Sequence, residues 1–454
     1  MSEKIQFASK IGLVAATVGS AVGLGNIWRF PAEAQANGGA AFLLVYVACV
    51  FLLGIPVMLA EFALGRGGRS DALGAFVNLG ARRPWWSVGI LAIVASYLIL
   101  SFYIVVAGWT FEYLWQSVTG FLYEPVGDAT VVSSGQFSAR MTQFIADGWN
   151  ATVNTYFMIA LNIVILLFGV QKGIERLSNV LMPLLFVLLV IFCGVSLSLP
   201  GAAEGLDYFL NPDFSKITPG VALNALGQAF FSLSLGMGIL VTYSSYYPRD
   251  TRLTRTAVTV SLLDLLVAVL MGVIIFPAVT SFHLEGEGLR GATLVFVTLP
   301  EVFARMPGTQ VWSTLFFLFL MVAALTSTIS IAEVSVAFMQ ERFRLTRVKA
   351  VLGVMLPLFL LSTVCALSQG VLSDVRIGGM VIFDALDFFA TNICLPVGSI
   401  FLCVYMGWFA PRGLFRNELT NGGTVTSRAY PLLLFLVRFV CPVLIAMVLF
   451  SNLV

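Results

Sequence analysis

Long apolar segments limit the fold of this chain more than any other feature of its sequence. They cover about residues 11–35, 40–64, 86–118, 152–169, 177–199, 220–247, 256–281, 311–340, 350–368, 380–410 and 430–451. A helix needs about 20 apolar residues to cross the hydrocarbon core of a bilayer. Charged residues make up only 11% of the sequence, too few for a surface that faces water. We therefore expect an all-α integral membrane protein of about 11 transmembrane helices that is embedded in the lipid bilayer.

The positions of Lys and Arg predict the orientation of these helices. If the N-terminus is cytoplasmic, the short inner loops hold most of the basic residues, among them Lys4, Lys10, Arg249, Arg252 and Arg255. Basic residues gather on the cytoplasmic side of membrane proteins. We therefore expect a multi-pass protein of the inner (plasma) membrane with its N-terminus inside and its C-terminus outside. The short tails favour a bacterial source, and the net charge of +2 says nothing more about partners. We expect no nucleic-acid partner.

Two of the apolar segments are interrupted near their middle by small and polar residues. The first contains Gly19-Ser-Ala-Val-Gly-Leu-Gly-Asn26, and the sixth contains Leu233-Ser-Leu-Gly-Met-Gly238. Glycine costs about 1 kcal/mol against alanine inside a helix, so both stretches predict a local break. Paired interruptions in the two halves of a membrane chain are typical of transporter binding sites.

The two breaks, at Val22–Gly25 and Ser234–Gly238, have a chemical consequence. A broken helix leaves unpaired carbonyls at the end of one half and unpaired amides at the start of the next. Inside a bilayer these groups must be satisfied or line a cavity. Carbonyl oxygens suit a hard cation, and the amides suit a carboxylate. An amino acid together with Na+ satisfies both halves of such a site.

Neutral oxygen atoms at the middle of the eighth segment extend this prediction. Ala323, Thr326 and Ser327 are spaced so that one carbonyl and two hydroxyls share a helix face. Neutral oxygens suit a monovalent ion better than Ca2+, which usually recruits several carboxylates. The alternative is that these hydroxyls bond to their own helix or to a neighbouring one.

Acidic and basic residues inside predicted spans mark further candidates. Asp264 lies near the middle of the seventh segment, where a carboxylate is costly and usually functional. It could bind Na+, carry a proton, or do both, or it could be held structurally by hydroxyls such as that of Ser232. Arg29 lies outward of Gly23, and Asp384 and Asp387 begin the tenth segment from the same side. An Arg–Asp pair closing a cavity is one interpretation, and contact of either charge with outer water is the other.

Other classes of site have little support in the sequence. His283 is the single histidine, so a His-rich metal site is excluded, and all six cysteines lie in predicted spans. No nucleotide-binding motif or nucleophile–base constellation is present, so we expect no enzyme. Two outer loops, 119–151 and 285–309, are predicted. The apolar centre of the second, Leu294 to Leu299, is either a re-entrant lid or a segment packed on its neighbours.

Several of these stretches together resemble a known family. They are Gly23-Leu-Gly-Asn-Ile-Trp-Arg-Phe-Pro31, Asn37-Gly-Gly39, Gly54-Ile-Pro56 and Phe230-Phe-Ser-Leu-Ser234. They are similar to the neurotransmitter:sodium symporters, and especially to the bacterial leucine-transporter-like branch of amino-acid transporters. The resemblance runs from about Phe7 to the tenth segment. It implies one transporter domain over 1–454 with an inverted five-plus-five repeat, about 10–200 and 220–410, an extra helix at 430–451, and helices 1 and 6 unwound at the midplane.

The resemblance also implies two sodium sites. The first would use the Ala21 carbonyl and the side chains of Asn26, Ser232 and Asp264 together with the substrate carboxylate. The second would use the carbonyls of Gly19, Val22 and Ala323 and the hydroxyls of Thr326 and Ser327.

The resemblance also implies a substrate site. The substrate carboxylate would meet the amides of Leu24 and Gly25 and the Tyr103 hydroxyl, and the amino group would meet the carbonyls of Ala21, Phe231 and Ser232. The side-chain pocket would consist of Ile99, Tyr103, Phe231, Ser234, Met237, Ser327 and Ile331. Related monoamine transporters carry an aspartate at the position of Gly23, so an amino acid is favoured. The apolar pocket, with the adaptable Met237, favours a hydrophobic or aromatic L-amino acid.

The resemblance also implies two gates and a dependence on particular ions. Arg29 and Asp387 would form the outer gate above Phe231 and Tyr103, and Lys4, Phe7, Tyr246 and Glu341 match the family's inner gate. Animal relatives bind chloride near the positions of Tyr46, Gln228 and Ser232. Their seventh helix usually carries Asn at the position of Asp264. Asp264 supplies that negative charge itself, so chloride independence is implied, and proton counter-movement becomes a hypothesis. The expected function is Na+-coupled symport of amino acids by alternating access. The alternatives are an ion channel and an amino-acid-sensing receptor.

Overall fold

The computed structural model describes residues 6–125, 135–282 and 291–453. Within this part of the chain, nine helical segments are long and apolar enough to cross a membrane. Each coincides with one of the predicted apolar segments. They are Ala40–Gly68, Arg83–Thr119, Trp149–Leu167, Val170–Leu197, Leu253–Ser281, Thr309–Arg342, Arg347–Leu367, Ile382–Phe409 and Tyr430–Leu453.

The remaining two predicted segments are the broken ones, as expected from their glycines. In the first, α1 (Lys10–Ala21) is followed after Val22–Leu24 by η1 (Gly25–Arg29) and α2 (Phe30–Ala36), with a bend of 54°. In the sixth, α11 (Pro219–Ser232) and α12 (Ile239–Ser245) flank the unwound residues Leu233–Gly238. Neither α11 nor α12 could cross a bilayer alone, so the pair forms one interrupted span. The predicted unwinding of helices 1 and 6 is confirmed, although the sixth break begins one residue before Ser234.

Backbone geometry explains why the sixth helix stops where it does. Ser234, Gly236 and Gly238 have φ values of +52°, +77° and +72°. A right-handed helix cannot continue through positive φ, and glycine adopts this region without the steric cost that a side chain adds. The Ser234 hydroxyl donates to the Ser20 carbonyl at 2.9 Å, so the sixth break satisfies a carbonyl that the first break leaves open.

The long spans consist of straight helices and of helices with inserted π-turns. Their elements are α3 (Ala40–Cys49), η2 (Val50–Gly54) and α4 (Ile55–Gly68); α6 (Arg83–Thr119); α8 (Trp149–Leu167); η4 (Val170–Glu175) and α9 (Arg176–Leu197); α13 (Leu253–Ser281); α16 (Thr309–Arg342); α17 (Arg347–Leu367); α18 (Ile382–Asp387), η8 (Phe388–Cys394), α19 (Leu395–Val404) and η9 (Tyr405–Phe409); and α21 (Tyr430–Phe435), η10 (Leu436–Val440) and α22 (Cys441–Leu453).

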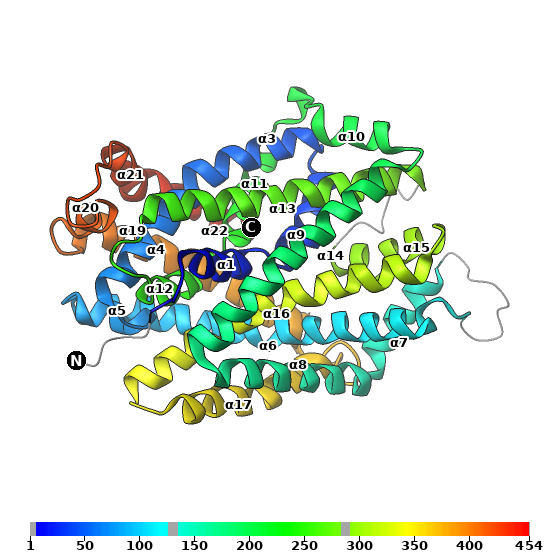
Figure 1. The fold of residues 1–454 in the computed structure, drawn as a ribbon, viewed down its shortest axis with the longest axis horizontal. Helices are drawn as coiled ribbons and strands as arrows, with labels where there is room; N and C mark the ends of the chain where they lie inside the picture. The colour runs from blue at the N-terminus through cyan, green and yellow to red at the C-terminus, as the bar shows by residue number, and fades with distance from the viewer. Residues whose placement is uncertain (1–5, 126–134, 283–290, 454) are drawn as a thin grey trace.

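Short elements connect these spans at the two ends of an elongated molecule. Figure 1 shows α5 (Ala72–Asn78) and α20 (Leu414–Leu419) at one end, and α7 (Gln136–Asp147), α10 (Ala202–Leu210) and α15 (Leu299–Ala304) at the other. This grouping matches the predicted inner and outer loops. The remaining short elements are η3 (Phe121–Tyr123), η5 (Phe214–Lys216), α14 (Gly291–Thr293), η7 (Leu294–Thr298) and the hairpin strands β1 (Arg376–Ile377) and β2 (Met380–Val381).

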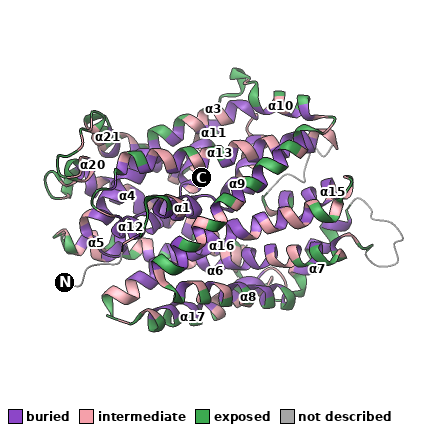
Figure 2. Ribbon diagram, in the orientation of Figure 1, coloured by how far each residue is buried: buried purple, intermediate pink, exposed green. Residues whose placement is uncertain are grey.

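Burial separates the helices that form the centre from those at the periphery. In α16, 83% of the most apolar window is buried, compared with 33% in the last span. Figure 2 shows the same contrast, with buried residues concentrated around α1, α12 and α16. The peripheral helices expose large apolar side chains such as Val190 and Leu360, as expected for lipid-facing surfaces.

The outer segment before α16 is packed against the bundle. Leu294, Val295 and Phe296 are buried, and the Phe296 ring centroid lies 4.8 Å from that of Tyr113 and 6.2 Å from that of Trp28. In this conformation the apolar centre of the predicted loop is therefore a packed segment, the second of the two interpretations. His283 and the first residues of this loop, up to Arg290, lie outside the described residues.

Candidate functional site

Three helices meet at a buried polar cluster beside the first break. Asn26 comes from η1, Ser232 from the end of α11, and Asp264 from the middle of α13. The Asn26 amide nitrogen donates to Ser232 Oγ at 3.0 Å and to Asp264 Oδ1 at 2.9 Å. Ser232 Oγ in turn donates to Asp264 Oδ2 at 2.6 Å. Sequence reasoning placed these three residues in one site, and the structure brings them together.

The cluster retains an acceptor with no donor. The Asp264 carboxylate fixes the orientation of the Asn26 amide, because only the NH2 group can face an acceptor. Asn26 Oδ1 therefore points elsewhere, and it is buried without a hydrogen-bond partner. A buried amide oxygen is seldom left unsatisfied. Oxygen donors and one fixed carboxylate are the ligands that a hard monovalent cation prefers, so the cluster fits Na+.

Backbone carbonyls of the first break have no donors either. Among the described residues, no amide or side chain donates a hydrogen bond to the carbonyls of Gly19, Ala21 or Val22. A Cβ at Gly19 would lie 3.4 Å from Thr326 Cβ, so the eighth span lies directly against this part of α1. Thr326 Oγ1 donates to the Ala323 carbonyl at 3.0 Å, and Ser327 Oγ is buried without a partner. Gly19, Val22, Ala323, Thr326 and Ser327 are the residues proposed from sequence for the second sodium site, and the Ala21 carbonyl was proposed for the first.

Gly23 lies in close contact with side chains of two other spans. A Cβ at Gly23 would lie 2.6 Å from Ser327 Oγ and 2.8 Å from the Tyr103 hydroxyl. The Leu24 amide donates to that same hydroxyl at 3.1 Å. The Leu24 amide, at the start of the outer half of helix 1, and the Tyr103 hydroxyl are therefore bonded to each other here, and both are groups that can donate to a carboxylate.

The residues predicted to form the side-chain pocket lie inside the bundle. Ile99, Ser234, Met237, Ser327 and Ile331 are buried, and Tyr103 and Phe231 are half-buried. The Phe231 ring also borders Gly25, where a Cβ would lie 3.0 Å from the ring carbons. Gly23 and Gly25 thus allow the first break to approach the side chains around it closely.

Comparison with known proteins decides the family. The model of the sodium:neurotransmitter symporter family matches residues 4–131 and 135–454. The chain is a member of this family. It is 38% identical over 460 residues to an uncharacterized sodium-dependent transporter, YhdH, of Bacillus subtilis (strain 168), which covers 100% of this chain and 99% of the relative. It is 33% identical to an uncharacterized sodium-dependent transporter of Haemophilus influenzae, covering 98% of each chain.

A solved structure extends the match from sequence to fold. The crystal structure of MhsT in complex with L-phenylalanine superposes with a TM-score of 0.88 at 41% identity, covering 99% of this chain and 100% of that one. The chain is therefore a sodium-dependent transporter with the all-α symporter fold, as its sequence predicted.

The outer-gate residues of this symporter are present but not paired. The Arg29 guanidinium lies over the Phe231 ring at 4.7 Å and 4.0 Å from a Glu33 carboxylate oxygen. The Asp387 carboxylate accepts a bond from Thr391 Oγ1 at 3.3 Å. Among the described residues no ion pair joins Arg29 to Asp387, so the predicted pair remains a prediction for another state.

At the inner end, the structure describes only part of the predicted gate. Phe7 is buried, its amide donates to the Tyr246 carbonyl at 3.1 Å, and Glu341 accepts from the Ser70 hydroxyl and the Asp71 amide. Lys4 lies outside the described residues. Sequence reasoning missed a buried ion pair nearby: Arg347 donates to both carboxylate oxygens of Glu333, at 2.9 and 2.7 Å, and the Tyr246 hydroxyl donates to Glu333 at 3.0 Å.

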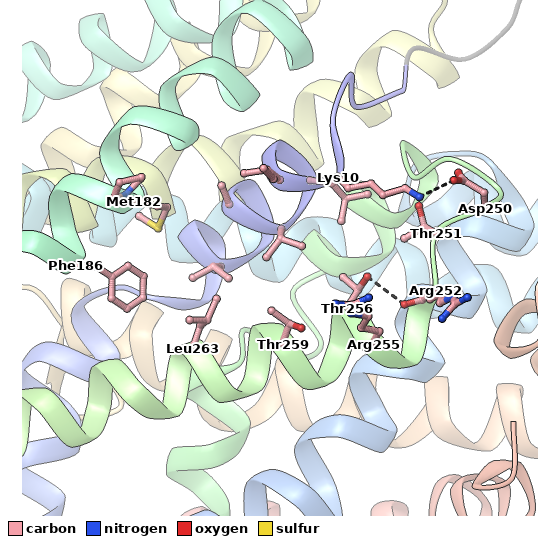
Figure 3. A pocket seen from close by; sticks show the side chains of 16 residues that line it. Lys10, Met182, Phe186, Asp250, Thr251, Arg252, Arg255, Thr256, Thr259 and Leu263 are labelled. Carbon is pink, nitrogen blue, oxygen red and sulfur yellow. Dashed lines mark hydrogen bonds and ion pairs between the residues drawn. The ribbon is translucent and has the colours of Figure 1, made fainter. Parts of the chain in front are cut away.

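A cavity of about 760 Å³ lies beside the inner half of α1, between α9 and α13 (Figure 3). One end of it carries Lys10, which pairs with Asp250 at 2.9 Å, together with Arg252 and Arg255. The opposite end includes Met182 and Phe186. A Cβ at Gly19 would lie 3.5 Å from Met182, so this side chain separates the cavity from the carbonyls of the candidate second sodium site.

Two buried acidic residues near the site were also missed. Glu61, on α4, accepts a bond from the Gly236 amide in the sixth break, and Glu175, in η4, accepts bonds from the amides of Ala8 and Ser9. Both lie within or next to predicted spans, so the rule that singled out Asp264 would have found Glu61 as well. Glu175 carries no such signal, because its partners are more than 160 residues away in sequence.

Proposed function

We propose that this transporter is a chloride-independent Na+-coupled symporter of hydrophobic or aromatic L-amino acids that works by alternating access. The observation that carries the proposal is the juxtaposition of Asn26 Oδ1, unpartnered and buried, with Asp264 and the open carbonyls of the first break. These oxygens would hold Na+ next to the place where the Leu24 amide and Tyr103 hydroxyl would take a carboxylate.

Substrate class follows from the groups around Gly23. The Leu24 amide and the Tyr103 hydroxyl suit the carboxylate of an amino acid, and Gly23 offers no carboxylate for an amine without one. The pocket side chains Ile99, Met237 and Ile331 are apolar, which favours a hydrophobic or aromatic side chain. The similar structure of MhsT was determined with L-phenylalanine, in agreement with this choice.

Chloride independence follows from the fixed charge on Asp264. Ser232 and Tyr46, two of the groups near which animal relatives bind chloride, both donate to Asp264 Oδ2, at 2.6 and 3.4 Å. A carboxylate in this position supplies the negative charge that chloride would bring, and it would repel chloride from the same donors.

The inner cavity suggests how water from the inner side would reach the cation sites. Met182 lines this cavity and also lies against Gly19, so an outward movement of the inner half of α1 would open the second sodium site to this side. The break at Val22–Leu24 provides the hinge for such a movement.

Binding measurements on the purified protein test the proposal. Labelled L-phenylalanine, L-tryptophan, L-leucine, glycine and dopamine would be compared in Na+ and in K+ buffers, each with and without chloride. We expect saturable binding of the large apolar amino acids in Na+ alone, with or without chloride, and weak binding of glycine and dopamine. Equal binding in K+ would contradict sodium coupling, and binding only with chloride would contradict the role given to Asp264.

A further inference from the structure

A buried carboxylate in α4 has no place in the transport site described above. The Glu61 side chain is completely buried. Its Oε1 accepts a bond from the Gly236 amide at 2.7 Å, and its Oε2 has no hydrogen-bond partner. No Lys or Arg side chain forms an ion pair with it in the part of the chain that the structure describes.

Comparison with Asp264 shows how different the two carboxylates are. Three side chains, Asn26, Ser232 and Tyr46, donate to the two oxygens of Asp264, and the proposed cation would lie beside it. Glu61 has one donor for two oxygens. Burying an ionised carboxylate without compensating partners costs far more than burying the neutral acid. Two carboxylates in such different surroundings therefore take different protonation states.

The described neighbours of Glu61 carry no positive charge that could compensate an ionised carboxylate. A small cavity of about 10 Å³ adjoins it, lined by Ala72 and Phe76 of α5, Val88, Gly89 and Ala92 of α6, Gly236, Gly238 and Val241 of the sixth span, and Gly398 and Leu402 of α19. All of these are apolar or glycine. The titratable groups that face Glu61 in the described structure are the buried thiol of Cys403 on α19 and, behind it, that of Cys441 on α22.

The position of this cavity indicates the side of the membrane to which Glu61 could release a proton. Its walls include α5 and the first turns of α6, which lie at the end of the molecule that carries α20 (Figure 1). This is the end with the basic loops, which the charge distribution places inside. The shortest way from Glu61 to water therefore leads to the inner side. At about 10 Å³ this space is at the lower limit for a single water molecule, which could pass a proton but leaves no room for an ion.

The hydrogen bond to Gly236 connects Glu61 to the moving part of the molecule. Gly236 lies in the sixth break, one residue before Met237 of the substrate pocket, and has φ +77°. A Cβ at Gly236 would lie 2.5 Å from Ser399 Oγ, which is itself buried without a partner. A rearrangement of the break would therefore change the single hydrogen bond that Glu61 accepts and the contact between Gly236 and Ser399.

From this geometry we infer that Glu61 is a proton-binding site of the transporter, open to the inner side and coupled to the sixth break. In the arrangement described here Oε2 carries the proton, and the neutral acid keeps the Gly236 amide bond through Oε1. When the break rearranges, the proton passes through the small cavity to inner water and the carboxylate forms. This inference rests on the proposed coupled transport, because the break must move during a cycle.

Infrared spectroscopy and transport on the intact protein test this inference together. Glu61→Gln keeps an oxygen that accepts from Gly236 and imitates the protonated acid without a proton to lose. We expect the wild type to show the C=O stretching band of a protonated carboxylic acid, Glu61→Gln to lose it, and Asp264→Asn to keep it. In proteoliposomes, Na+-driven uptake should change with the pH of the inner buffer in the wild type and become independent of it in Glu61→Gln.

Each part of the inference can fail separately from the proposed function. A wild-type spectrum without such a band, or a band that persists in Glu61→Gln, overturns proton binding at Glu61, and the wild-type measurement holds even if the variant does not fold. Loss of the band with an unchanged effect of inner pH overturns the coupling. Ser399→Ala, which keeps the carboxyl group, should retain the band. Absence of Na+-driven uptake in the wild type would refute the symport proposal, while the spectrum would still report on Glu61.

Discussion

At the scale of single residues, Asp264 combines a fixed negative charge with three hydrogen-bond donors. The donors orient both of its oxygens, and Asn26 Oδ1 remains beside them without a partner. A neutral side chain at this position would keep the shape of the cluster and remove its charge. The chemistry of the site therefore depends on one carboxylate, which a conservative substitution can test.

Asp264→Asn removes that charge with little change in volume. We expect Na+-dependent amino-acid binding either to require chloride, which would replace the lost negative charge, or to disappear. The measurement is the affinity for L-phenylalanine in Na+ with chloride or gluconate as the anion. Thr280→Val serves as the control and should behave as the wild type, because the Thr280 hydroxyl, on the same helix, bonds among the described residues to the Phe276 carbonyl alone. Unchanged, chloride-independent binding by Asp264→Asn would refute this account.

Gly23→Ala tests the space assigned to the substrate. The added methyl would lie 2.6 Å from Ser327 Oγ and 2.8 Å from the Tyr103 hydroxyl. Overpacking of this kind costs about 1–3 kcal/mol, so amino-acid affinity should fall about tenfold or more. Gly227→Ala is a matched control, because its nearest neighbour, Val448, would lie at an ordinary 3.7 Å. Equal affinity for both variants would place the substrate elsewhere.

Several of these residues could be predicted from sequence and others could not. Asn26, Ser232 and Asp264 stand out because polar groups are rare in the middle of apolar segments. The bond from the Leu24 amide to Tyr103 and the unpartnered oxygen of Asn26 depend on side-chain orientations, which spacing does not determine. Glu61 was missed because it lies away from the centre of its span, although an acid in a membrane helix is a signal at any depth.

At the scale of elements, the inner half of α1 is held in place by η4. Glu175 accepts from the amides of Ala8 and Ser9 at 2.8 and 2.9 Å and from the Ser9 hydroxyl at 2.8 Å. These bonds satisfy donors at the start of α1, which no helical carbonyl can reach. A Cβ at Gly12 would lie 2.2 Å from Glu175, so the glycine is needed for this close contact.

Releasing this contact should loosen the inner half of α1. In Glu175→Ala, the amides of Ala8 and Ser9 lose their acceptor, and α1 should move away from η4 more often. A cysteine introduced at Val14, on the wall of the inner cavity, should then react faster with a maleimide, by about tenfold for a loss of about 1.4 kcal/mol. The six native cysteines are buried, so the background reaction should be low.

The control for this experiment is Glu204→Ala, which removes an exposed carboxylate from α10 at the other end of the molecule. It should leave the labelling rate unchanged. If Glu175→Ala also leaves the rate unchanged, Glu175 does not restrain α1.

Elements differ in how well the sequence predicts them. Long apolar segments and glycine-rich interruptions predict the spans and the two breaks, because hydrophobic length and helix propensity act locally. The helix α7, within the polar loop 119–151, was not predicted, since it is stabilised by packing of Phe137, Met141 and Phe144 against the bundle. The π-turns, such as η4, likewise depend on contacts between distant parts of the chain.

At the scale of the whole molecule, two breaks about 200 residues apart in sequence lie next to each other inside the bundle. The Ser234 hydroxyl joins the sixth break to the Ser20 carbonyl of the first, and Asn26 joins the outer half of the first helix to α11 and α13. A cavity of about 760 Å³ lies on one side of this centre, next to α1. Such an arrangement suits a site that opens to one side of the membrane at a time.

Uptake into proteoliposomes tests the central claim most directly. The purified protein would be reconstituted, and accumulation of labelled L-phenylalanine, L-tryptophan and L-leucine measured with an inward Na+ gradient, without a gradient, and with K+ in place of Na+. The account predicts accumulation above the outer concentration only with the Na+ gradient, and its loss in Asp264→Ala. Sodium-dependent binding without accumulation would contradict symport and indicate a receptor, and accumulation that ignores the Na+ gradient would contradict sodium coupling.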